Sequence, residues 1–143
     1  MNNGNGPVPI LVLSDSVDYP SGLSLIARDV GYLLSKMPEF RVASVGRGGR
    51  ASANIPFHQY VISESDGWGE RRLQERWSDW AGNDRGVLFT IWDASRVRYL
   101  VDKQSKDRGF VEWMNRGPFE RWGYFPVDAE GIGGRLTGVL SDT

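Results

Sequence analysis

Short apolar runs recur along the chain and predict the strands of a sheet. Val8–Leu13 and Val87–Trp92 are nearly continuous apolar runs, and Phe40–Val45 is a third. Runs without polar alternation are typical of strands that are buried on both faces of a parallel sheet. Two further strands are predicted over Phe57–Ile62 and Trp122–Val127. The pattern therefore predicts five strands.

Helical spacing separates these runs. The first helix is predicted by apolar residues that share one face, namely Ile26, Val30, Leu33, Leu34 and Met37. Pro38 ends this helix. A charged helix is predicted over 69–81 with Trp77 and Trp80 toward the core, and a third helix is predicted after Asp93. Because strands and helices alternate, we expect a Rossmann-like three-layer α/β/α fold with a mostly parallel, doubly wound sheet.

The length predicts a single domain. The chain has 143 residues, of which 40% are hydrophobic, and this is enough for one core and too little for a second domain. We expect residues 1–7, which are rich in Gly and Asn, to be a disordered tail and residues 8–143 to form the domain. No signal peptide and no membrane span is visible, so we expect a cytoplasmic protein.

Charge and residue counts exclude several classes of function. Seventeen basic and eighteen acidic residues are mixed along the chain and give a net charge of −1, which argues against nucleic acid as a partner. The absence of cysteine excludes disulfides, a Cys-ligated zinc and a cysteine nucleophile. His58 is the sole histidine and is expected at the surface or the edge of the core. We therefore expect neither a metal nor a cofactor.

Polar residues at the end of the first strand are candidates for ligand binding. In parallel sheets, ligands bind beyond the carboxyl ends of the strands. Asp15 follows the first strand, and Ser21, Gly22 and Leu23 open the next helix, whose first amides and dipole can hold a phosphate or a sugar hydroxyl. The alternative is that Ser21 is only a helix cap and that Gly22 only allows close helix packing.

Two aspartates after later strands are the candidate catalytic residues. Asp93 and Asp128 can accept hydrogen bonds from sugar hydroxyls or serve as a base. A helix cap is the alternative explanation of Asp93. Three tryptophans near loops or strand ends, Trp68, Trp92 and Trp122, are candidates for stacking on a sugar ring.

Common nucleotide-binding motifs are absent from the sequence. There is no G-x-x-x-x-G-K-[ST] phosphate loop, and the first loop lacks G-x-G-x-x-G. The second strand ends in Gly46-Arg47 rather than in an acidic residue that could bind a ribose diol, which argues against a nicotinamide dehydrogenase. Arg47 leaves open only a dehydrogenase that recognises the 2′-phosphate of its nicotinamide cofactor.

Three segments resemble one enzyme family. Residues 10–34, 86–93 and 122–129 are similar, in this order, to the first, fourth and fifth strands of family 4 glycosyltransferases and the segments around them. The resemblance implies the N-terminal, acceptor-side domain of a GT-B fold, in which a nucleotide-sugar lies between two Rossmann-like domains. It also implies retaining hexosyl transfer without a metal. By this match, Ser21, Gly22 and Leu23 approach the donor phosphates, and Asp93 and Asp128 line the acceptor side.

The chain departs from the family pattern at its end. It stops at Thr143, before the last strand of such a domain and before the donor-binding domain. We therefore expect that the missing domain or a partner chain is needed and that the isolated chain is inactive. The alternative is a stand-alone Rossmann-like or flavodoxin-like module that binds a nucleotide or a protein. An exposed sheet edge would also allow a homo-oligomer.

Overall fold

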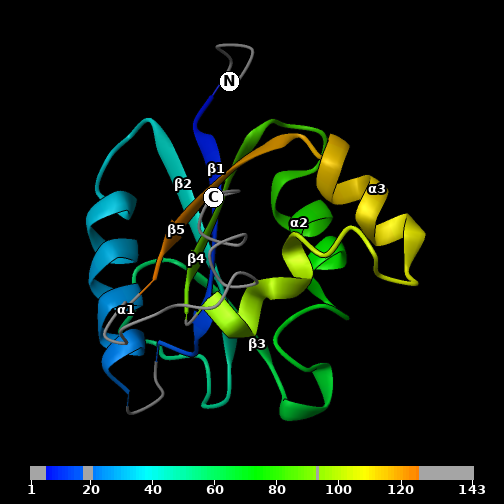
Figure 1. The fold of residues 1–143 in the computed structure, drawn as a ribbon. Helices are drawn as coiled ribbons and strands as arrows, with labels where there is room; N and C mark the ends of the chain where they lie inside the picture. Colours follow the sequence, from blue (N-terminus) through cyan, green and yellow to red (C-terminus); the bar gives the residue numbers. More distant parts are fainter. Residues whose placement is uncertain (1–5, 18–20, 93, 126–143) are drawn as a thin grey trace.

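A five-stranded parallel sheet forms the centre of the molecule (Figure 1). The computed structural model describes residues 6–17, 21–92 and 94–125. The strands are β1 (Val8–Asp15), β2 (Phe40–Arg47), β3 (His58–Ile62), β4 (Gly86–Ile91) and β5 (Phe119–Tyr124). The helices are α1 (Gly22–Ser35), α2 (Leu73–Ala81) and α3 (Arg108–Arg116), with two 3-10 helices, η1 (Glu64–Asp66) and η2 (Ala94–Leu100). The strand order is β3-β2-β1-β4-β5, and every neighbouring pair is parallel.

Helices cover both faces of the sheet, as Figure 1 shows for α1 on one side and α2 and α3 on the other. Alternate residues of β1 point to opposite faces, which divides the core into two halves. Ile10 and Val12 belong to the half that contains α1, whereas Leu11 and Leu13 belong to the half that contains α2, η2 and α3. All four are essentially inaccessible to solvent. The predicted three-layer, doubly wound α/β fold is therefore confirmed.

The order in which strands are added to the sheet reverses between β1 and β4. From β1 the chain runs through α1 to β2 on one side, while β4 lies on the other side of β1 and is followed by η2 and α3 on the opposite face. The register pairs Ser14 with Ile91, so Asp15 and Trp92 come next at the same edge of the sheet. In open α/β sheets, such a reversal opens a crevice at the carboxyl ends of the two strands.

Two predicted boundaries are wrong by a few residues. The α2 helix begins at Leu73 rather than at residue 69, because Gly67 and Gly69 have φ values of +64° and +100°, which a right-handed helix does not allow. The β5 strand begins at Phe119 rather than at Trp122. Phe119 is buried and its ring centroid lies 5.0 Å from that of Trp77, so packing against α2 sets the start of the strand.

The α3 helix was not predicted. Asp107 caps it by accepting a hydrogen bond from the Phe110 amide at 3.0 Å, and Phe110, Val111 and Met114 are buried. With only nine residues, the helix shows too short a periodic pattern to be recognised. The segment after Asp93 is a 3-10 helix with a kink at Val97 rather than a regular α-helix.

His58 is exposed at the start of β3 and stacks on Trp80, with a distance of 5.6 Å between ring centroids, so its predicted place at the surface is confirmed. Within the described ranges, no helix combines the length and the apolar character that crossing a bilayer requires. Residues 1–5 of the predicted tail and everything after Phe125 lie outside the described residues.

Candidate functional site

A buried carboxylate joins β1 and β4 at their carboxyl ends. The indole Nε1 of Trp92 donates a hydrogen bond to Oδ1 of Asp15 at 2.8 Å. Trp92 is fully buried, and the Asp15 side chain is 10% exposed. A buried carboxylate needs donors around it to offset lost hydration, and the indole supplies one. This bond lies at the point where the strand order reverses, and we call the region the β1/β4 crevice.

Asp15 also contacts the start of α1 and the start of η2. The Ser21 hydroxyl donates to Oδ2 of Asp15 at 2.8 Å, and the Arg96 guanidinium forms an ion pair with Oδ1 at 3.7 Å. Donors from three elements therefore surround a single carboxylate. These contacts make Asp15 a group that organises the crevice, because its oxygens are already bonded to the protein.

A capping box begins α1 at the crevice. The Ser21 hydroxyl accepts from the Ser24 amide at 3.0 Å, and the Ser24 hydroxyl accepts from the Ser21 amide at 3.3 Å. Ser21 is therefore a helix cap, as the alternative interpretation of the sequence stated. The first intrahelical donor in this turn is the Leu25 amide, which bonds to the Ser21 carbonyl at 3.3 Å. Gly22 and Leu23 precede it in the first turn, where amides have no intrahelical acceptor.

The end of β2 lies unusually close to the turn after β1. A Cβ atom at Gly46 would lie 2.4 Å from Cα of Ser16, so only glycine allows this approach. The Ser16 amide donates to the Arg47 carbonyl at 3.0 Å, which continues the ladder past the end of β1. The close approach brings Arg47 to the edge of the crevice.

Two arginines lie against one indole at this edge. The guanidinium carbon of Arg47 is 3.9 Å from the ring centroid of Trp68, and that of Arg96 is 4.6 Å from it. The negative face of an indole attracts a guanidinium by about 0.5–2 kcal/mol, depending on exposure. The Trp68 ring also meets the Trp92 ring edge-on at 5.5 Å. Trp68 thus links the arginines of β2 and η2 to the buried centre of the crevice.

The backbone around Trp68 is fixed by glycines and hydrogen bonds. The flanking Gly67 and Gly69 have positive φ values. The Arg47 Nε donates to the Gly67 carbonyl at 2.7 Å, and the Tyr99 hydroxyl donates to the Trp68 carbonyl at 2.7 Å. Burial, with a contribution from nearby Glu70, raises the pKa of Tyr99 well above its usual value, so the phenol stays a hydrogen-bond donor. The turn therefore holds Trp68 in a defined position.

The structure groups several of the predicted site residues. Asp15, Ser21 and Trp92 are in direct contact, and Gly22 and Leu23 follow Ser21 in the first turn of α1. Trp92 has no exposed ring face, so the prediction that it stacks on a sugar is wrong, and its indole serves as a buried donor. Asp93 and Asp128, the candidate catalytic residues, lie outside the described residues.

The other two tryptophans differ in position. Trp68 belongs to the crevice, but the two guanidinium groups occupy its ring. Trp122 is 37% exposed and lies opposite Phe89 within the β4–β5 register, with a distance of 5.9 Å between ring centroids. Trp122 therefore lies in the body of the sheet, not at the strand end where stacking was predicted.

Sequence reasoning missed that Arg47 and Arg96 lie against the same indole ring, that of Trp68. Gly46-Arg47 at a strand end and the doublet of glycines around Trp68 are visible in the sequence. No local pattern shows that the 67–69 turn folds back onto the end of β2, since this contact joins segments about twenty residues apart through Arg47 and Gly67.

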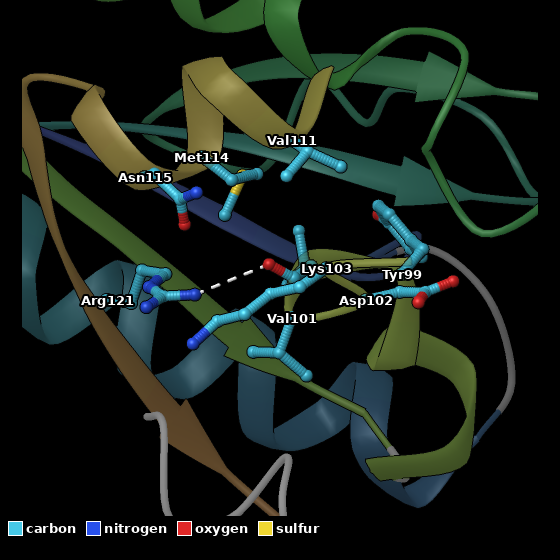
Figure 2. Close-up of a pocket in the computed structure, with 9 residues that line it drawn as sticks. Tyr99, Val101, Asp102, Lys103, Val111, Met114, Asn115 and Arg121 are labelled. Carbon is cyan, nitrogen blue, oxygen red and sulfur yellow. Dashed lines mark hydrogen bonds between the residues drawn. The ribbon is translucent and has the colours of Figure 1, made fainter. Parts of the chain in front are cut away.

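A hollow of about 110 Å³ lies between η2, α3 and β5 (Figure 2). Its lining combines apolar side chains of α3, Val111 and Met114, with charged side chains of Asp102, Lys103 and Arg121. Arg121 donates to the Leu100 carbonyl at 3.3 Å across it. Tyr99, whose hydroxyl donates to the Trp68 carbonyl, also lines this hollow, so the hollow adjoins the crevice. Among the described residues, no group of three or more acidic or histidine side chains is placed to hold a metal ion.

Comparisons with models of protein families, with curated proteins and with solved structures gave no match to this chain.

Proposed function

We propose that this chain is the N-terminal, acceptor-side domain of a GT-B glycosyltransferase of the family 4 type. The observation that supports the proposal most is the strand order β3-β2-β1-β4-β5, with its reversal at the β1/β4 crevice. A flavodoxin-like domain has the order 2-1-3-4-5, so the order favours the Rossmann-like half of a GT-B fold over that alternative. The segments that resemble the family contribute most of β1, all of β4 and half of β5.

The proposed chemistry is transfer of a sugar from a nucleotide-sugar to an acceptor hydroxyl. The start of α1 is proposed to face the donor phosphates, because the first-turn amides of Gly22 and Leu23 and the helix dipole favour negative charge there. Asp93 and Asp128 keep their proposed role as hydrogen-bond acceptors for the acceptor sugar. Asp15 is proposed to position the residues around it and not to react.

Transfer is proposed to need a second, donor-binding domain in the same or in a partner chain. In the GT-B arrangement, the nucleotide-sugar lies between two such domains, and most of the charge that develops on the leaving diphosphate is stabilised by the donor side. The domain described here would then contribute acceptor binding and one side of the phosphate site.

A binding panel tests the proposed function. The full chain is titrated calorimetrically with neutral saccharides, with nucleotide-sugars and, as the matched alternative, with FMN and free nucleotides. We expect saccharides and nucleotide-sugars to bind, and Ser21→Ala to weaken nucleotide-sugars while leaving neutral saccharides unchanged. Binding of FMN alone would overturn the proposal in favour of a stand-alone nucleotide-binding module.

A further inference from the structure

Arg47 has terminal nitrogens that the described part of the protein does not use. Its Nε donates to the Gly67 carbonyl at 2.7 Å and its guanidinium lies on the Trp68 ring at 3.9 Å. Within the described ranges, neither of its Nη atoms has a hydrogen-bond partner, although the side chain is half-buried. Trp68 and the Gly67 carbonyl thus fix the orientation of the planar Arg47 guanidinium, and its two Nη groups remain open to a ligand.

The two carboxylates near the Arg47 guanidinium, Asp15 and Glu70, accept hydrogen bonds from other groups. Asp15 accepts from Trp92 and Ser21. Glu70 accepts from the Trp68 amide at 3.0 Å. Neither carboxylate forms an ion pair with Arg47. Among the residues that the structure describes, no carboxylate therefore pairs with the positive charge of Arg47 next to the crevice.

Arg96 adds a second guanidinium on the same indole. It lies 4.6 Å from the Trp68 centroid, its side chain is 33% exposed, and it forms an ion pair with Asp15 at 3.7 Å. Two guanidiniums around one ring match a group with several oxygens and two negative charges better than they match a singly charged carboxylate. Phosphate esters have these properties.

We propose that the acceptor of this domain carries a phosphate ester, which Arg47 and Arg96 bind at the rim of the β1/β4 crevice. The substrate class rests on the proposed function, because it assigns the oxyanion to the acceptor. The oxyanion site itself rests on the two arginines and Trp68. The same chemistry is present in a donor diphosphate, so the test compares both sources.

The test is calorimetric titration of the full chain at constant ionic strength, which keeps non-specific charge effects equal. The ligands are glucose, glucose 6-phosphate, uridine diphosphate and inorganic phosphate. We expect glucose 6-phosphate to bind at least about tenfold tighter than glucose, as a charge-assisted hydrogen-bond pair allows. Arg47→Gln and Arg96→Gln should each remove most of this advantage, measured in each variant as the ratio of the affinities for glucose 6-phosphate and glucose.

Arg85→Gln is the matched control. Arg85 is exposed and directly precedes β4, at the amino end of the strand and thus at the end opposite the crevice. Its loss therefore changes the net charge equally without touching the crevice. Circular dichroism verifies that each variant folds, and either arginine variant alone suffices. If neither folds, competition in the unmodified chain decides: inorganic phosphate should displace glucose 6-phosphate and not glucose.

The outcomes separate this inference from the proposed function. Equal binding of glucose and glucose 6-phosphate would overturn the phosphate site while the glycosyltransferase proposal stands. Arginine-dependent binding of uridine diphosphate, without that of glucose 6-phosphate, would assign the site to the donor and overturn the acceptor assignment. Arginine-dependent binding of phosphate without binding of any sugar would support the oxyanion site and contradict glycosyl transfer.

Discussion

Single residues fix individual contacts between elements of the fold. Gly46 is one, since its backbone lies against that of Ser16 and leaves no room for a side chain. Tyr60 is another, since its hydroxyl donates to Asp79 and thereby links β3 to α2. Each position has a physical reason for its residue type, and each reason can be tested by one substitution.

Gly46→Ala is expected to destabilise the fold by about 1–3 kcal/mol, because the added methyl group would collide with backbone atoms that cannot move aside easily. Gly109→Ala is the matched control: it lies in α3 with no atom closer than 3.6 Å to the new Cβ, and alanine should stabilise this helix by about 0.5–1 kcal/mol. Urea unfolding measures both changes. Equal stability of the two variants would show that the approach of β2 to Ser16 is not tight.

Tyr60→Phe tests the link between β3 and α2. Burial, and then the hydrogen bond to Asp79, raise the pKa of Tyr60 from 10.0 to about 12. The folded state therefore holds this proton more tightly than the unfolded state does. The resulting stabilisation is complete below pH 10, declines as the pH rises from 10, and is lost at pH values above about 12.

The unmodified chain should thus exceed Tyr60→Phe in unfolding free energy by about 1 kcal/mol at neutral pH. The difference should shrink as the pH rises from 10 to 12. Urea unfolding of both proteins at matched pH values provides the measurement. A difference that stays constant across this range would contradict the assigned hydrogen bond.

At the scale of elements, the β1–α1 connection carries the geometry of the crevice. The capping box of α1 shares Ser21 with Asp15, so the start of the helix and the end of β1 are fixed together. The turn around Trp68 plays the same role between η1 and α2, with Arg47 and Tyr99 bonded to its carbonyls. The crevice is therefore built from the ends of elements, as is usual for sites in parallel sheets.

Ser21→Ala should cost about 1 kcal/mol of stability through the lost cap, and more if Asp15 also relaxes. Ser35→Ala, at the other end of the same helix, is the control. Its hydroxyl bonds only to the nearby Tyr32 carbonyl at an exposed position, and the change should stay within about 0.5 kcal/mol. Thermal unfolding of both variants gives the comparison. Similar losses at both ends would mean that the cap at the crevice has no special role.

At the scale of the whole molecule, alternation of apolar runs and helical patterns was sufficient to predict the fold class. Runs such as 8–13 are apolar because both faces of β1 are buried, which leaves a strong signal in the sequence. The α3 helix was not predictable in this way, because its pattern spans only nine residues. The exact start of β5 was not predictable either, because the packing of Phe119 against Trp77 decides it.

The candidate site was predictable only in part. Asp15 ends β1 and Ser21 follows it before α1, so the rule on strand ends was enough to select them. The burial of Trp92 and the position of Trp68 on Arg47 depend on contacts between distant segments, and neither composition nor spacing reports such contacts. The strand-end rule thus locates the edge of the sheet, while tertiary packing decides which side chains remain open to a ligand.

Ligands are proposed to bind at the carboxyl ends of β1 and β4. Nuclear magnetic resonance of the isotope-labelled full chain, titrated with glucose 6-phosphate, tests this proposal most directly. We expect the largest amide shifts around the crevice, at Ser16, Gly22, Arg47 and Trp68. Shifts confined to the hollow between η2, α3 and β5, or to the outer face of α1, would contradict it.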